Sequence, residues 1–340
     1  MVAIKQWLMG CGAVVMGVSV AQAASSSVQV YGEIDTALAR TYTDAMNMGM
    51  VSSYTGDTKL GFKGSEDLGN GLKLNFQLEA SGMNSDTGAW TGAFQRQSWV
   101  GFSGTHFGDF KMGRTTTPQN RAMGQFDLNG SADGSSALKL LNLGANNSLV
   151  GARESNQVQY TTPNWQGLQG RVAYGFSETV HGAHDQKRNF FQVAGTYKHG
   201  GLVVGATYQP EHYAAQKVTA QNYRDGYAVG AKYDFGMLQV SAFYTRNVHA
   251  TDGAGGGIGV MMPWDAWELG LQMARVRKAE KADGSRSDKQ GAQAMELFAN
   301  YRLSKRTSFY GAYGKANTTA THAFKLKHDN TAAIGITHKF

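Results

Sequence analysis

The sequence predicts an all-β protein: a transmembrane, sixteen-stranded antiparallel β-barrel. Three features of the chain support this. The N-terminus resembles an export signal, short segments alternate in polarity from end to end, and the connections between them alternate between short and long. Alternation with a period of two puts apolar side chains on one face of a strand and polar ones on the other. Strands can span lipid as a closed barrel, because closure leaves no unpaired edge.

Residues 1–23 have the features of a cleaved secretory signal. Lys5 supplies a positive charge, residues 7–20 are mostly apolar, and Ala21-Gln22-Ala23 matches a small-residue cleavage site. The sole cysteine, Cys11, lies within this segment, so the mature protein is expected to have no disulfide. A membrane-anchored first helix fits less well because the apolar run is short. A lipoprotein site fits less well because the apolar run follows the cysteine.

The composition favours many strands joined by tight turns. The chain has 44 glycines but only 4 prolines, and 11% of its residues are aromatic. After residue 23 no run of 18 apolar residues occurs, which argues against a membrane helix. The formal net charge of +7 is scattered along the chain, so we expect no nucleic-acid partner.

The mature chain, residues 24–340, is expected to form one barrel domain. Sixteen is an even number, as expected for a bacterial barrel. The predicted strands are 27–41, 56–65, 71–82, 93–104, 108–114, 154–163, 168–177, 188–199, 201–211, 223–235, 237–248, 255–262, 265–277, 291–303, 306–317 and 330–340. Of these, 255–262 has the weakest pattern.

The last strand and the longest connection are the most informative segments. In residues 331–340 apolar and polar positions alternate, and the strand ends on Phe340, which suits a lipid boundary better than water. The connection 115–153 is too long to be a simple linker, and it carries little charge and many Gly, Asn and Ser residues. Such a loop is suited to fold into a wide lumen and narrow it.

Several runs resemble the general porins of Gram-negative bacteria, of the beta-proteobacterial type. They include the mature start SVQVYGEID, the runs LGFKGSEDLGNGLK, FQLE, RQSWVGF and MGR, and the late runs YRLSKRT and GITHKF. The resemblance runs from about residue 27 to the end. It implies a sixteen-stranded barrel, a homotrimer, a third loop folded inward (115–153), and passive diffusion of small hydrophilic solutes and ions. It also implies outer-membrane lipid and lipopolysaccharide as surroundings, and recognition of Phe340 and the last strand by the barrel-assembly machinery.

The same resemblance implies which charges line the narrowest part of the pore, the eyelet. Bases on the wall face acids, one of them on the inward loop. Matched by motif, the bases are Lys59, Arg96 and Arg153, with Arg114 as a further candidate, and the acids are Glu79 and Asp127. Charges at a constriction decide which ions pass, and three wall bases against two acids predict a mild anion preference.

Strand alternation checks part of this set. Lys59 lies opposite in phase to Leu60, Glu79 to Leu78, and Arg153 to Val158, which directs all three to the lumen. Arg96 shares its phase with the apolar Val100 and Phe102, so its place rests on the resemblance alone. The alternative for every one of these residues is an ordinary solvated charge on a polar face.

No cofactor, metal or catalytic residue is expected. The sequence His181-Gly182-Ala183-His184-Asp185 offers metal-like ligands, but their spacing is loose and no further ligands accompany them. No motif brings Ser, His and Asp together as in a hydrolase. Besides a general pore, a substrate-specific channel with a saturable solute site stays open, as does an outer-membrane enzyme or adhesin, which the sequence favours less.

Overall fold

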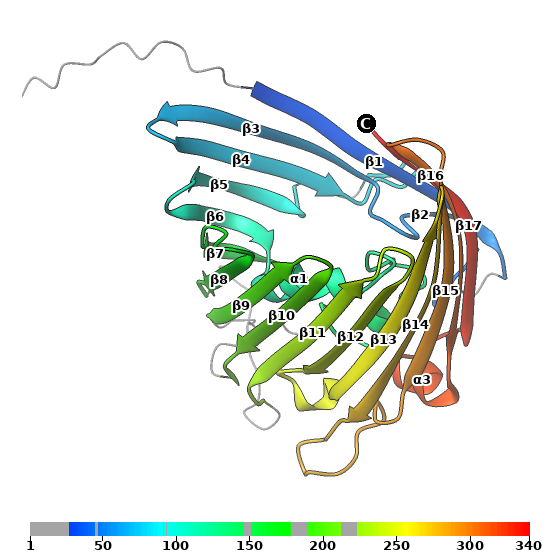
Figure 1. The fold of residues 1–340 in the computed structure, drawn as a ribbon. Helices are drawn as coiled ribbons and strands as arrows, with labels where there is room; N and C mark the ends of the chain where they lie inside the picture. The colour runs from blue at the N-terminus through cyan, green and yellow to red at the C-terminus, as the bar shows by residue number, and fades with distance from the viewer. Residues whose placement is uncertain are drawn as a thin grey trace, which may run out of the picture.

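The protein is a closed antiparallel barrel, seen in a computed structural model (Figure 1). The structure describes residues 27–44, 47–90, 92, 94–145, 151–177, 189–211 and 223–340. The expected signal, residues 1–23, and the His181–Asp185 motif lie outside these ranges. Among the described residues, no helix is both long and apolar enough to cross a membrane.

Sixteen long strands form the ring in the described part of the chain, and a short strand, β2, lies beside them. The strands are β1 (Ser27–Arg40), β2 (Gly49–Ser52), β3 (Lys59–Gly69), β4 (Leu72–Ser81), β5 (Gln97–Gly104), β6 (Gly108–Thr116), β7 (Arg153–Thr161), β8 (Leu168–Gly175), β9 (Phe190–His199), β10 (Leu202–Gln209), β11 (Gly226–Asp234), β12 (Gln239–Arg246), β13 (Ala254–Trp264), β14 (Trp267–Lys278), β15 (Gln293–Arg302), β16 (Thr307–Ala316) and β17 (Asn330–Lys339). Strands neighbouring in sequence pair with one another, and the predicted sixteen-stranded barrel is confirmed.

The first and last long strands close the barrel. Strand β1 pairs with β17 from Glu33↔Lys339 to Arg40↔Ala332. On its other edge, β1 pairs with β3 in its first half and with β2 further along. Strand β2 was not predicted, because its four residues lie within a long connection. The weakly patterned segment 255–262 belongs to an 11-residue strand, β13.

The two faces of the barrel have opposite character. Apolar side chains face outward and are exposed, for example Val28 (65%), Ile258 (63%) and Ile334 (67%). Polar side chains face inward, and some of them, such as Gln272 and Glu296, are fully buried beneath the long loop. A soluble sandwich has the reverse arrangement, so the outer face is one that lipid covers.

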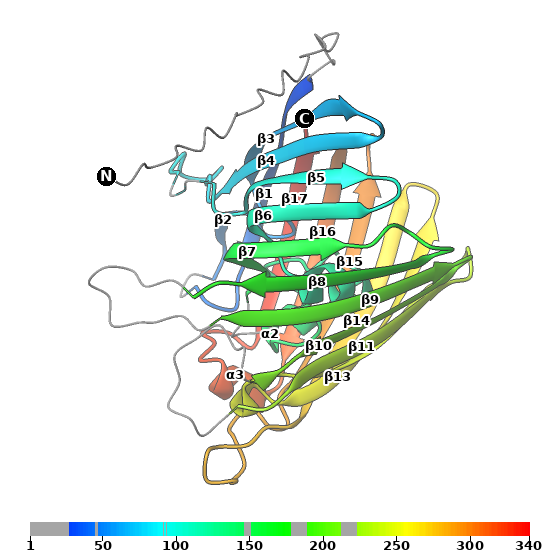
Figure 2. The ribbon, with the colours of Figure 1, turned by 90° about the vertical axis from the view of Figure 1, so that its left-hand side faces the viewer.

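The long loop between β6 and β7 lies inside the barrel (Figures 1 and 2). It contains α1 (Pro118–Met123), η1 (Gly124–Phe126) and α2 (Ala137–Leu140); outside it lie η3 (Ala250–Asp252) and α3 (Thr318–Ala323). Helix α1 contacts β9 and β10, and α2 contacts β14 and β15. Hydrophobic burial holds the loop, since Leu138, Leu141 and Leu143 are buried in one cluster with the wall residues Ala274 and Ala294.

Glycines on the inner wall make room for the loop. A Cβ at Gly230 would lie 2.5 Å from the Phe126 ring, and one at Gly205 would lie 3.0 Å from it. Phe126 is 1% exposed, so its ring fills the space that these two glycines leave open on β10 and β11. The wall is therefore shaped to receive the loop.

Candidate functional site

A charged cavity of about 600 Å³ lies between the inward loop and the wall. Its lining comes from two sides: strand residues of the wall, such as Glu33, Lys59 and Arg302, and loop residues, such as Asp133 and Lys139. The lining includes six bases and four acids, namely Lys59, Arg96, Lys139, Arg153, Arg302, Lys339, Glu33, Asp57, Asp133 and Glu268. The lining thus carries two more positive than negative charges.

Lys59 faces this cavity, as strand alternation predicts. It lies directly across from Glu33 in the β1–β3 pair, and Lys59 Nζ is 2.9 Å from Glu33 Oε2. Neighbouring strands bring them together because directly opposed residues share a face. Both side chains are partly exposed, at 22% for Lys59 and 11% for Glu33, so the pair presents a dipole to the lumen.

Arg96 also lines the cavity, although its phase matches outward residues. It lies just before the first residue of β5, so the alternation of that strand does not govern it. Its Nε donates to Glu79 Oε1 at 2.5 Å, and its guanidinium forms a second ion pair with Asp57. Tyr31 holds Glu79 from the other side, since its hydroxyl donates to Glu79 Oε2 at 2.7 Å.

Arg153 completes the basic side of the cavity at the end of the loop. Its guanidinium is 3.9 Å from Asp57, so this acid lies between Arg96 and Arg153. The alternation argument used for Arg153 does not apply, because the β6–β7 register shifts between Arg153 and Val158, where Asn156 adopts φ 51°. Arg153 reaches the cavity because it borders the loop.

The other three predicted residues do not line this cavity. Glu79 is 7% exposed and lies behind Arg96, whose position it fixes. Arg114 donates to the Gln95 carbonyl and, at 3.0 Å, to Ser155, beside the loop entry. Asp127 is 5% exposed and accepts hydrogen bonds from Ser136 and Gln272. Asp127 is thus a loop anchor, and the loop acid at the cavity is Asp133.

Asp127 belongs to a buried network that fixes the loop to the wall. Glu296 on β15 accepts hydrogen bonds from Asn129 (2.7 Å) and Ser135 (2.5 Å) of the loop. Gln272 Nε2 on β14 donates to both acids, at 2.9 Å to Asp127 and 3.0 Å to Glu296. Buried carboxylates need such donors, and here the loop and the wall both supply them.

Sequence reasoning missed seven charged residues of the cavity. Three of them, Glu268, Arg302 and Lys339, lie on β14, β15 and β17, and the other four are Glu33, Asp57, Asp133 and Lys139. Alternation in β1 puts Glu33 on the polar face with Gln29 and Tyr31, so that signal was available. Asp57, Asp133 and Lys139 lie in connections, where alternation gives no direction. Asp133 and Lys139 form an ion pair with each other on the loop.

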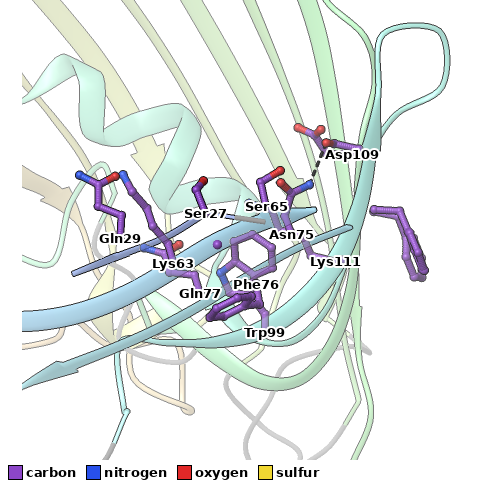
Figure 3. Close-up of a pocket in the computed structure, with 15 residues that line it drawn as sticks. Ser27, Gln29, Lys63, Ser65, Asn75, Phe76, Gln77, Trp99, Asp109 and Lys111 are labelled. Carbon is purple, nitrogen blue, oxygen red and sulfur yellow. Dashed lines mark hydrogen bonds between the residues drawn. The ribbon is translucent and has the colours of Figure 1, made fainter. Parts of the chain in front are cut away.

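A second lumen cavity, of about 420 Å³, lies nearer the short turns on the wall of β1 and β3–β6 (Figure 3). Lys63, Gln77, Trp99 and Lys111 point into it from neighbouring strands. Lys111 Nζ lies 4.1 Å from the centroid of the Trp99 ring. The Trp99 Nε1 is buried and has no hydrogen-bond partner among the described residues.

The barrel thus combines a lipid-facing exterior, a polar lumen and an inward loop. The family model described as Gram-negative porin matches residues 12–321. The chain belongs to the Gram-negative porin family. The resemblance drawn from its sequence motifs is confirmed.

Relatives and solved structures agree with this assignment. The porin is 29% identical to outer membrane porin protein 32 of Delftia acidovorans, over 92% of this chain and 91% of the relative. It is also 29% identical to an outer membrane porin protein of Bordetella pertussis, over 96% of this chain and 98% of that relative. An anion-selective porin from Comamonas acidovorans superposes with a TM-score of 0.70 at 26% identity, covering 93% of this chain and 100% of that one.

An OmpF structure from Salmonella typhi, at 17% identity and a TM-score of 0.70, shares the fold, covering 92% of this chain and 97% of that one. Family and barrel place this porin in the outer membrane as a multi-pass β-barrel, and indicate a channel rather than an enzyme.

Proposed function

We propose that this porin is a general diffusion pore for small hydrophilic solutes and ions, with a mild preference for anions. The observation that carries the proposal is the excess of bases over acids, six against four, around the loop-narrowed cavity. In a water-filled channel such charges bias ion entry without a transport cycle. The similar Comamonas acidovorans porin, which is described as anion-selective, supports the same sign.

The eyelet in this proposal consists of Lys59, Arg96 and Arg153 against Glu33 and Asp57, with Asp133 and Lys139 on the loop. Glu79 acts by holding Arg96, and Asp127 by holding the loop. One unit charge at about 7 Å in water contributes about 0.6 kcal/mol, which is roughly a threefold bias. Because most of the charges are paired, the preference is small.

The pore is further proposed to work as a homotrimer in the outer membrane. Residues 1–23 are removed on export, and Phe340 with the last strand engages the barrel-assembly machinery. Short turns lie on one rim and long loops on the other, which sets the long loops outside the cell. Lipopolysaccharide then surrounds the long-loop rim.

Planar-bilayer recording tests the function. We expect purified porin to insert as open channels whose conductance steps come in threes. In asymmetric KCl, the sign of the reversal potential should be the one that preferential permeation of anions produces. Residues 24–340 refolded from denaturant provide a control free of co-purified channels. A membrane that stays sealed after confirmed insertion contradicts the pore, and a cationic reversal potential contradicts the proposed selectivity alone.

Asp57→Asn should make the pore more selective for anions. Asp57 lies between Arg96 and Arg153, so its removal leaves both guanidiniums with less compensation. Loss of one negative charge predicts roughly a threefold rise in the anion-to-cation permeability ratio. Asp288→Asn, on a long outer loop with an 82% exposed side chain, is the matched control. A ratio that is equal in the two variants rules Asp57 out of the selective region.

A substrate-specific channel is the second candidate, favoured by the cavity in Figure 3. There, Lys63 and Lys111 line the cavity, and Lys111 Nζ lies over the Trp99 ring, an arrangement suited to an anionic solute. A specific channel would show current that saturates with solute concentration and is blocked by micromolar solute. A general pore shows neither.

A further inference from the structure

The second lumen cavity, drawn in Figure 3, differs from the eyelet cavity in how its lysines are surrounded. Lys63 on β3 stands directly across from Gln29 on β1 and from Gln77 on β4, so both of its neighbours on the inner wall are neutral. Lys59, on the same strand and the same face, stands across from Glu33 and forms an ion pair with it. The wall that neutralises Lys59 thus leaves Lys63 without an acid directly across from it.

Lys111 on β6 has the same kind of surroundings. It stands across from Gly101 on β5 and from Gln159 on β7. Its Nζ lies 4.1 Å from the centroid of the Trp99 ring. An aromatic face attracts an ammonium group through its quadrupole and adds no net negative charge. The positive charge of Lys111 is therefore held in place and stays uncompensated.

The charge balance of this cavity favours a monoanion. Among the described residues, its lining carries Lys63 and Lys111 against a single acid, Asp109, which leaves one positive charge in excess. Neither lysine takes part in an ion pair within the part of the chain that the structure describes. Arg121 on the inward loop and Arg171 on β8 lie close enough to act electrostatically on Lys111. Their field raises the concentration of anions along this wall.

Neutral hydrogen-bonding side chains share the lining with the two lysines, namely Ser27, Gln29, Ser65, Asn75, Gln77 and Ser103. Asn75 Nδ2 donates to Ser103 Oγ at 2.8 Å, and Gln77 Nε2 donates to the Tyr31 hydroxyl at 2.6 Å. A primary amide has two N–H donors and a carbonyl acceptor, so each of these fixed amides keeps capacity for a further hydrogen bond. Donors and acceptors side by side are suited to the hydroxyl groups of a solute.

A glycine makes the hollow between the basic side and the amide side. Gly101 occupies an inward position of β5, directly between Asn75 on β4 and Lys111 on β6. Because it has no side chain, the wall is lower there than on either side. The resulting cavity of about 420 Å³ lies within the range of about 300–1,000 Å³ that is typical of small-molecule sites.

We propose that this cavity binds a carboxylate that carries several hydroxyl groups, which is the chemistry of a sugar acid. Lys63 and Lys111 attract the carboxylate, and Asn75, Gln77 and Ser65 form hydrogen bonds with the hydroxyls. A neutral sugar lacks the charge and a simple carboxylate lacks the hydroxyls, so both bind more weakly. The inference rests on the open pore of the proposed function, and it deepens the second candidate by naming the solute class. The site is open to the water of the lumen, so it adds a solute preference to a pore that also passes other ions.

Saturation-transfer NMR of the refolded porin in detergent, with gluconate as the probe, tests the site. We expect saturable binding of gluconate, and several-fold weaker binding of glucose and of acetate. Lys63→Gln with Lys111→Gln should weaken gluconate binding roughly tenfold, from about threefold for each unit charge. Lys198→Gln with Lys232→Gln is the matched control, because these two lysines are also on the inner wall, on β9 and β11, but do not line the cavity. The control should bind gluconate as the wild type does.

Asn75→Ala tests the neutral side of the site without changing any charge. It should weaken gluconate binding several-fold and leave acetate binding unchanged, because acetate has no hydroxyl for the amide to bind.

Two results overturn the proposal: equal gluconate binding by the Lys63/Lys111 variant and the Lys198/Lys232 control, or binding of glucose or acetate as tight as that of gluconate. Planar-bilayer recording of the same samples separates this test from that of the pore. Open channels without saturable gluconate binding contradict the solute site alone, whereas a sealed membrane after confirmed insertion contradicts the proposed function. Open channels formed by each variant show that it has folded.

Discussion

Replacing both Lys59 and Arg153 with glutamate should turn the pore from anion preference to cation preference. Each substitution changes the local charge by two units. Two units at about 7 Å in water correspond to about 1.2 kcal/mol, so each substitution should change the anion-to-cation permeability ratio roughly sevenfold. Lys59→Glu also sets a new carboxylate beside Glu33, across the β1–β3 pair. Arg153→Glu sets one near Asp57. The reversal potential in asymmetric KCl measures the change.

Two matched variants sharpen this test. Lys59→Gln with Arg153→Gln removes the charges without reversing them, and should give about half the shift in free energy. Lys305→Glu with Arg306→Glu reverses two charges on the exposed short turn, away from the cavity lining, and should shift the potential much less. The shift should shrink at high salt, because the Debye length falls to about 3 Å at 1 M. An unchanged potential would remove Lys59 and Arg153 from the eyelet.

Glu296→Leu should release the inward loop from the wall. The substitution removes the carboxylate that accepts hydrogen bonds from Asn129, Ser135 and Gln272, so Asn129 and Ser135 lose this acceptor while Gln272 keeps its bond to Asp127. Each buried donor left unsatisfied costs about 1–3 kcal/mol, so the attachment loses several kcal/mol. The expected result is a single-channel current that fluctuates between levels, with a larger mean conductance. Trypsin should then cleave the loop after Lys139, a site that is protected while the loop is attached to the wall.

Glu296→Gln is the graded companion of this variant, since it keeps one acceptor oxygen and should disturb the loop less. Glu268→Leu, on the adjacent strand and facing the lumen cavity, controls for loss of a lumen acid. A Glu296→Leu channel with steady current, wild-type conductance and an intact loop after trypsin would show that the apolar contacts of Leu138, Leu141 and Leu143 suffice to hold the loop.

The strands could be predicted because the chemistry of a barrel strand is local. Successive side chains of each strand face lipid and water in turn. The sequence of a strand therefore shows its extent and which side chains face the lumen, as in residues 331–340. Lys59 could be directed to the lumen by the same reasoning. Alternation gives no valid direction where the ladder is irregular: Arg96 precedes its strand, and a register shift separates Arg153 from Val158.

The sequence alone was sufficient to predict a closed barrel of sixteen strands with a polar interior, because side chains alternate between apolar and polar along the strands. Which charges meet in the lumen depends on contacts between segments that are far apart in the chain. Asp57, Asp133 and Lys139 lie in connections whose direction no periodicity fixes, and Asp127 turns to the wall because Gln272 and Ser136 offer it hydrogen bonds there. Strand faces follow from local alternation, whereas a loop takes its path from burial and hydrogen bonding with strands far away in the chain.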